Sequence, residues 1–274
     1  MSEFEYISYL NYCFKNDKLI RWADNMMPLT LFVSPFRWYK AKDQEYKYYQ
    51  MIEEAIDIWE KSSGGKVKFQ PVANLYDSQI NIDWKRVDRK SLGNCYFNFD
   101  KTGRLFSAEI QIGLSDGLLH REYENKNEVL HTIIHEIGHA LGLQHSPFRD
   151  DIMYVPHQYG VTRISNRDQY TLKWLYQFPF GVSKKDILTH YKLSSKYDVD
   201  KLIYMLETNL SPEDFQEKQQ GVPRLQTNEE KLHNEQNNLA EFNKFNLSIQ
   251  NFNVSADAEE YFRKLRIKKD FGKK

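Results

Sequence analysis

Residues 135–145 have the sequence HEIGHALGLQH, the stretch that most constrains how this chain can fold. Residues four apart on an α-helix are about 40° apart in projection, so His135 and His139 share one face. Both imidazoles can therefore reach the same metal ion. Glu136 is rotated by about 100° from His135, so it can lie beside that ion without being a ligand. The pattern predicts a helix that carries a metal-binding face.

Gly142 decides whether a third histidine can join this site. His145 follows His139 by six residues and would point elsewhere if the helix continued. Glycine readily adopts the left-handed conformation that ends a helix, so Gly142 predicts a turn that returns His145 to the ion. Three histidines leave the fourth tetrahedral position of Zn²⁺ open, which is typical of a catalytic site. We expect a Zn²⁺ cofactor held by His135, His139 and His145.

The motif HExxHxxGxxH is matched at every fixed position and resembles the signature of the metzincin clan of zinc endopeptidases. Met153, eight residues after His145, is similar to the methionine that lies beneath the zinc in that clan. Ser146 and the methionine–tyrosine pair at 153 most resemble the matrixin branch. Asp168 stands where matrixins have an aspartate that supports the methionine turn. The resemblance covers about residues 27–180.

This resemblance implies a zinc-dependent endopeptidase that hydrolyses peptide bonds with a zinc-activated water. Glu136 is expected to act as the general base and to pass the proton to the leaving amine. An extended protein or peptide substrate is expected to pair with an edge strand near residues 94–99. Two alternatives stay open: a catalytically silent zinc-binding interaction protein acting through its C-terminal region, and a hydrolase of non-peptide substrates.

The sequence also departs from the matrixin pattern. Matrixins place a proline two residues after the methionine, whereas Val155 intervenes here and the proline is Pro156. The segment 85–106 lacks the pattern of the family's structural zinc and calcium loops. The family's latency motif is absent, because Cys13 lies in the unrelated context NYCFK.

Hydrophobic periodicity predicts the secondary structure around the motif. Helices are expected at residues 43–62, 127–141 and 165–177, and strands at 28–34, 66–70, 79–84, 92–99 and 107–113. The last two strands are separated by a DKTG turn and predict a hairpin. With the resemblance, this implies an α+β fold: a metzincin-type catalytic domain with a twisted, mostly parallel five-stranded sheet, a backing helix and an active-site helix.

We expect three regions along the chain. An N-terminal lead-in covers 1–26, a matrixin-like zinc metalloprotease domain 27–180, and a helical, Asn/Gln-rich C-terminal extension 181–274. Short helices are expected at 183–193 and 198–210, and a basic amphipathic helix after residue 256. Because the polar extension is unsuited to a tight core, a chain ending near Phe180 is expected to fold and bind zinc.

Composition excludes several other classes. The chain has 38 basic and 38 acidic residues, so no broad positive field is available to attract nucleic acid. No apolar run is long enough for a transmembrane helix, and two cysteines exclude a disulfide scaffold. The N-terminus lacks the pattern of a signal peptide, so we expect a cytoplasmic protein or release without a classical signal. A monomer is expected.

Two further histidines need an interpretation. His131 precedes His135 by one helical turn, so it shares the metal-binding face, and a packing or supporting role is favoured. His157 could polarise a substrate, although a loop position is favoured. Cys95 is expected to be an unreactive strand residue, because nothing basic next to it would lower the pKa of its thiol.

Overall fold

The computed structural model describes residues 6–36, 45–86, 92–114 and 125–215. Its central feature is a five-stranded sheet in the order β4-β3-β5-β7-β6. Neighbouring strands run parallel except β6, which is antiparallel to β7. The sheet therefore confirms the predicted mostly parallel arrangement. The strands are β3 (Leu29–Val33), β4 (Phe69–Pro71), β5 (Ile80–Arg86), β6 (Gly93–Phe99) and β7 (Leu105–Leu114).

Alternation along the strands explains why this sheet forms. On β5, Ile80, Ile82 and Trp84 are buried, while the residues between them are half-buried or exposed. Successive side chains of a strand point to opposite faces, so one face of β5 joins the core. The turn between β6 and β7 contains Gly103 at a φ of 88°, a value that favours glycine.

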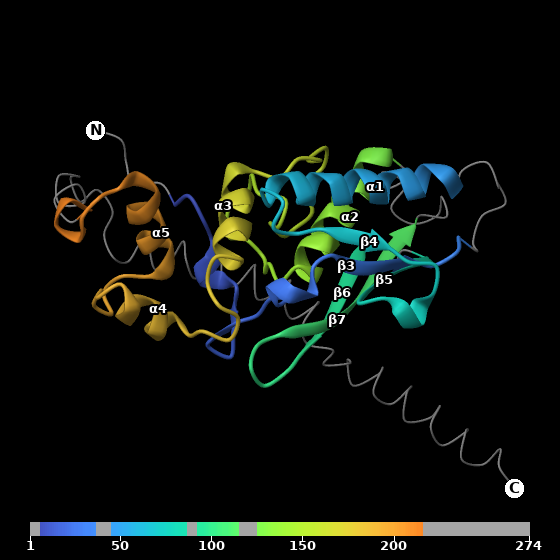
Figure 1. Ribbon diagram of the computed structural model, residues 1–274. Coiled ribbons are helices and arrows are strands. Elements are labelled where there is room, and N and C mark those ends of the chain that lie inside the picture. The colour runs from blue at the N-terminus through green and yellow to red at the C-terminus, as the bar shows by residue number, and fades with distance from the viewer. Residues whose placement is uncertain (1–5, 37–44, 87–91, 115–124, 216–274) are drawn as a thin grey trace, which may run out of the picture. The chain divides into compact units, whose positions relative to one another are not determined.

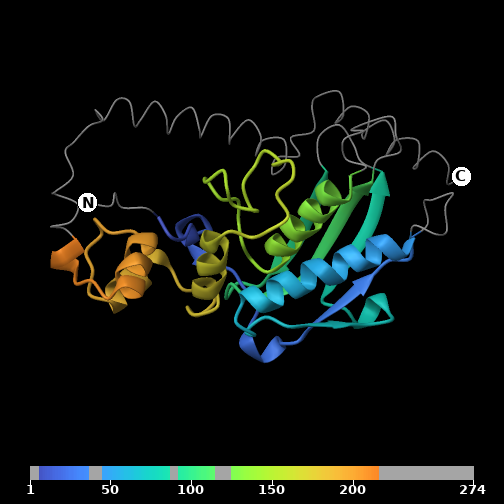
Figure 2. The ribbon, with the colours of Figure 1, turned by 90° about the horizontal axis from the view of Figure 1, so that it is seen from above.

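Two helices cover the same face of the sheet, α1 (Glu45–Ser62) and α2 (Lys126–Ala140) (Figures 1 and 2). Ile52, Ala55 and Trp59 recur at three- and four-residue spacing on α1 and are buried. The Trp59 indole N–H donates to the Ile134 carbonyl of α2 at 2.9 Å, which fixes the two helices side by side. They are the predicted backing helix and active-site helix.

Three shorter helices follow: α3 (Asn166–Leu175), α4 (Lys184–His190) and α5 (Val199–Thr208). Ser165 and Ser183 cap α3 and α4 through reciprocal capping boxes, and Asp198 caps α5. These caps satisfy the backbone N–H groups that each helix leaves unpaired at its start. All three helices lie where the sequence predicts them.

The lead-in folds into short elements that pack into the core. They are η1 (Leu10–Tyr12), β1 (Phe14–Lys15), β2 (Lys18–Leu19) and η2 (Asp24–Met26), and a further turn, η4 (Leu75–Asp77), follows β4. Tyr9 and Trp22 are fully buried in the same hydrophobic cluster as Ile203 of α5. The Trp22 indole N–H donates to the Ala140 carbonyl at the end of α2, at 2.7 Å.

The chain divides into two compact units, Met1–Leu225 and Gln226–Lys274. Both predicted limits of the catalytic domain, after residues 26 and 180, lie inside the first unit and stay predictions. The helix expected after residue 256, and most of the Asn/Gln-rich stretch, lie outside the described residues. Among the described helices, none combines the length and hydropathy that a membrane span requires.

Candidate metal centre

Three histidines converge at the end of α2. His135 and His139 come from the helix and His145 from the loop that follows it, and one ring nitrogen of each lies within 4.8 Å of the others. The Nε2 atoms of His139 and His145 are 3.1 Å apart. The structure therefore brings together the three predicted ligands in a group that could hold a metal ion.

The turn at Gly142 returns the chain to the site. Gly142 has a φ of 105°, and the N–H of Leu143 donates to the Gly138 carbonyl at 3.0 Å. A Cβ at position 142 would collide with the carbonyl oxygen of Ile20. The Leu143 carbonyl in turn accepts a hydrogen bond from Nδ1 of His139 at 2.9 Å. The predicted turn is confirmed, and it also orients one of the histidines.

Hydrogen bonds fix the protonation of two imidazoles. Nδ1 of His135 lies 2.8 Å from the carbonyl oxygen of Ile152, and a carbonyl can only accept. Nδ1 of His135 and of His139 must therefore carry the proton, which leaves Nε2 with a lone pair for a metal. Burial, reinforced by neighbouring histidines, lowers the pKa of His139 to about 3 and that of His135 well below its usual value. Both rings are neutral near pH 7, as metal ligation requires.

Glu136 lies between the helix and the edge strand. Burial raises the pKa of its carboxyl group to about 8, and the charge of Lys85 opposes this shift. A Cβ on Gly93 of β6 would lie 2.7 Å from Oε1 of Glu136 and 2.6 Å from Cγ2 of Thr132. The lack of a side chain at position 93 thus lets β6 approach this face of α2. Glu136 is thus a buried carboxyl group on the face of α2 that meets β6.

A methionine turn follows the histidines and packs against α2. Met153 is fully buried, and its sulfur occupies the space that a Cβ on Gly138 of α2 would need. The N–H of Ser146 donates to the Met153 carbonyl at 2.9 Å. The N–H of Ile152 donates to Oδ2 of Asp168 at 2.9 Å. Met153 thus packs against α2 at Gly138, and the predicted aspartate support is confirmed.

A second histidine pair lies beside the site. His131 donates from Nδ1 to the Val161 carbonyl at 2.7 Å, and burial lowers the pKa of its ring to about 4. Its ring centroid is 4.1 Å from that of His157, whose Nε2 lies 2.6 Å from Oε2 of Glu128. His131 therefore packs outside the group of three, as expected. Glu128 was not predicted from the sequence, although its position three residues before His131 places both on one helical face.

A family model described as Matrixin matches residues 22–177. The chain belongs to the matrixin family. "Probable matrix metalloproteinase 095L" of Invertebrate iridescent virus 3 is 28% identical over 151 residues, covering 51% of this chain and 38% of that protein. Karilysin of Tannerella forsythia is 29% identical over 143 residues, covering 48% of this chain and 29% of that protein. The chain thus spans less than half the length of these curated relatives.

The match contains every residue of the candidate site in this matrixin. Matrixins are zinc-dependent metalloproteases, and such proteases act on protein or peptide substrates. The family and the group of three histidines together support a metalloprotease, a hydrolase, with a zinc site. The mostly parallel sheet with its two covering helices agrees with the metzincin fold.

Proposed function

We propose that this matrixin is a zinc-dependent endopeptidase whose metal is held by His135, His139 and His145. The donor set supports this assignment, because neutral imidazole nitrogen is a preferred zinc ligand. Tetrahedral ligands about 2.0–2.1 Å from zinc lie about 3.3 Å from each other. The two Nε2 atoms at 3.1 Å come close to that separation before any adjustment. This convergence of three imidazoles, two of them anchored through Nδ1, is the observation that carries the proposal.

We propose Glu136 as the general base. When bound, zinc polarises the scissile carbonyl and makes the attacking water more acidic. Glu136 accepts the proton of that water on a carboxylate oxygen and later releases it to the leaving amine nitrogen. Burial favours the protonated form of this carboxyl group, with a pKa of about 8, and a dication nearby would lower this pKa. The close approach of Gly93 on β6 leaves the carboxylate next to the strand proposed to bind substrate.

The substrate is proposed to be an extended protein or peptide segment. Among the described strands β6 ends the sheet order, and Glu136 lies directly against it. An extended chain beside residues 94–99 would add a strand to the sheet through main-chain hydrogen bonds. Such binding would place a peptide bond near both the three histidines and the base.

The test is the variant Glu136→Gln, which keeps the size of the side chain and removes the base. We expect one zinc per chain, as in the wild type, with turnover of an unstructured peptide lowered by about 10²–10⁴-fold. The matched control is Glu128→Gln, because Glu128 is also buried on α2 but bonds to His157 and to the Gly160 N–H. The control is expected to keep more than about a tenth of wild-type turnover.

Two outcomes would contradict this mechanism. Cleavage by Glu136→Gln at the wild-type rate would show that another group moves the proton. Zinc bound by a wild-type chain that cleaves no member of a peptide library would favour the catalytically silent interaction protein. A wild-type chain that binds no zinc would refute the proposed metal centre.

A further inference from the structure

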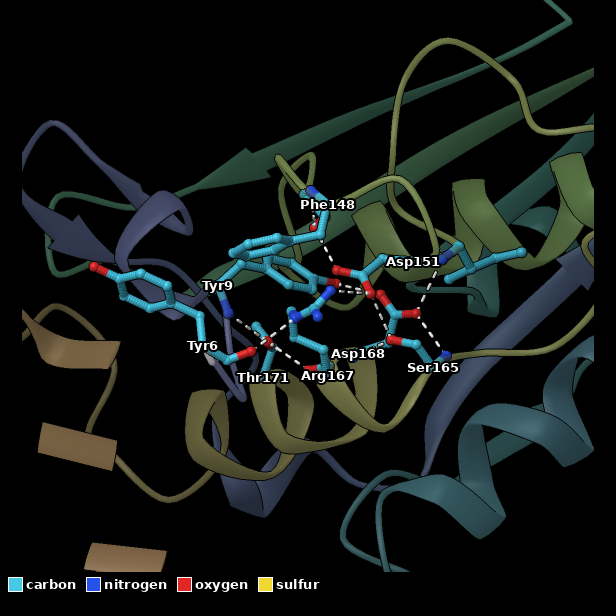
Figure 3. Close-up of polar contacts among 10 residues, drawn as sticks. Tyr6, Tyr9, Phe148, Asp151, Ser165, Arg167, Asp168 and Thr171 are labelled. Carbon is cyan, nitrogen blue, oxygen red and sulfur yellow. Dashed lines mark hydrogen bonds and ion pairs between the residues drawn. The ribbon is translucent and has the colours of Figure 1, made fainter. Parts of the chain in front are cut away.

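Residues 8–13, here called the N-terminal brace, run between α3 and α5. Tyr9 is fully buried, and its hydroxyl donates to Oδ1 of Asp168 at 2.7 Å. Its backbone N–H donates to Oγ1 of Thr171 at 3.0 Å, so both ends of the residue are fixed on α3 (Figure 3). The brace is thus attached to the helix that supports the methionine turn.

The same aspartate leads to the metal centre. Oδ2 of Asp168 accepts from the Ile152 N–H at 2.9 Å, and the Ile152 carbonyl accepts from Nδ1 of His135 at 2.8 Å. Three successive hydrogen bonds therefore connect the Tyr9 hydroxyl to a proposed zinc ligand. Every group along this path is buried, so water cannot readily replace a lost partner.

The tyrosine hydroxyl completes the hydrogen bonding of a costly buried charge. Asp168 is fully buried and has a second carboxylate, Asp151, nearby, and the pKa of Asp168 is raised to about 6, chiefly by burial. Oδ2 accepts from two main-chain N–H groups, those of Ile152 and Ser165, whereas Oδ1 accepts from Tyr9. Removing the hydroxyl would leave Oδ1 short of a donor, and the carboxylate could shift.

The brace also contacts the other side of the site. Sγ of Cys13 accepts from the backbone N–H of Gln144, the residue before His145, at 3.5 Å. Cys13 is fully buried, and burial raises the pKa of its thiol to about 12. The thiol therefore stays protonated and serves as a packing contact.

The brace is held from behind by α5. The Ser8 hydroxyl and the Asn11 N–H both donate to the carboxylate of Asp200, at 2.5 and 3.1 Å. Asp200 is buried on the face of α5 that meets the brace. The extension thus fixes the segment that carries Tyr9.

We propose that Tyr9 is a positioning residue of the metal centre, which holds Asp168 so that the Ile152 carbonyl orients His135. The inference rests on the proposed role of His135 as a zinc ligand. Partners that orient a ligand are commonly worth 10–100-fold in metal affinity. Because Tyr9 acts through two further groups, Tyr9→Phe is expected to weaken Zn²⁺ binding by about 3–10-fold.

The experiment uses the full chain, stripped of metal and titrated with Zn²⁺ against a chromophoric chelator. The matched control is Tyr197→Phe, which removes the hydroxyl of another buried tyrosine, one that donates to the Pro212 carbonyl at 3.3 Å. The control is expected to bind Zn²⁺ within twofold of the wild type. Substitution with Co²⁺ gives a second measurement, since its visible bands follow ligand geometry. These bands should shift in Tyr9→Phe and not in Tyr197→Phe.

A double variant tests the path. Asp168→Asn is expected to weaken Zn²⁺ binding by about 10-fold, and adding Tyr9→Phe should cause little further loss, because both changes break one chain of contacts. Additive losses would overturn the proposal. So would Zn²⁺ affinity and Co²⁺ bands in Tyr9→Phe that match the control, or a Tyr9→Phe chain that stays unfolded in saturating Zn²⁺. Failure of the wild type to bind Zn²⁺ would instead refute the proposed function.

Discussion

The metal centre and the N-terminal brace lie against each other, but their contacts span very different distances along the chain. The three histidines and the methionine beneath them lie within residues 135–153. The brace bonds Tyr9 to Asp168 and Ser8 to Asp200, across 159 and 192 residues. A short motif can therefore reveal a catalytic site while giving no sign of what holds it in place.

The largest expected effect comes from removing α4 and α5. A chain ending after Val182 would lose Asp200 and the buried side chains of Ile187, Val199, Leu202 and Ile203. Each large aliphatic side chain contributes about 1.5–3 kcal/mol when buried, against a total stability of about 5–15 kcal/mol. We expect this chain to lack a cooperative melting transition and to bind no zinc, as measured by circular dichroism and metal analysis.

This expectation reverses the one drawn from sequence, in which a chain ending near Phe180 folds. The control is a chain ending at Leu225, the end of the first compact unit, which should melt at the full-length temperature. A cooperative, zinc-loaded 1–182 chain would show that the brace works without α5. The catalytic domain would then end where the sequence predicted.

An intermediate effect is expected at Gly142, where the metal centre meets the lead-in. Alanine at a φ of 105° is strained by about 1–2 kcal/mol, and its Cβ would collide with the Ile20 carbonyl, which adds about 1–3 kcal/mol. Gly142→Ala should therefore lower the free energy of unfolding by about 2–5 kcal/mol in urea titrations. Gly64→Ala is the control, because Gly64 also has a positive φ, 63°, but no atom within 4 Å of its Cβ position. Equal losses would show that the contact with Ile20 adds nothing.

Gly142 also shows what sequence reasoning can and cannot supply. The left-handed turn follows from the need to return His145, and the structure confirms it. The close approach of Ile20 has no local signal, since that residue lies more than a hundred positions away. A local backbone conformation can be predicted from residue type and spacing. The distant residue that packs against it, here Ile20, is set by the whole fold.

In the fold, too, local elements were predictable from the sequence and contacts between distant segments were not. Strands and helices were predictable because burial repeats every second residue on β5 and every third or fourth on α1. The strand expected at 66–70 is instead β4 at Phe69–Pro71, because among the described residues this strand pairs with Leu29–Leu31 of β3 alone. Glu128 and Tyr9 were missed because single polar contacts between distant segments leave no period in the sequence.

The smallest expected effect concerns the pH dependence of the bond between the brace and α5. Burial raises the pKa of Asp200 to about 7, while the Ser8 hydroxyl and the Asn11 N–H oppose this shift. The carboxyl group of an unfolded chain has a pKa near 3.9. Between these values the folded chain holds a proton that the unfolded chain has released. Stability from Asp200 is therefore full below about pH 4 and is lost as the pH rises through about 7.

The amide introduced by Asp200→Asn cannot ionise, so this variant should not lose stability as the pH rises. Between pH 5 and pH 8 the unfolding free energy of the wild type should fall by about 2–3 kcal/mol relative to that of the variant, measured in urea with metal-free protein. Asp168, whose pKa is also raised, is unchanged in both chains, so its contribution cancels in the comparison.

Asp186→Asn is the control, because hydrogen bonds from Ser183 lower the pKa of this exposed carboxyl group. Its difference from the wild type should stay constant over the same range. A constant difference for Asp200→Asn as well would mean that its carboxylate stays charged, and that the two donors of the brace outweigh its burial.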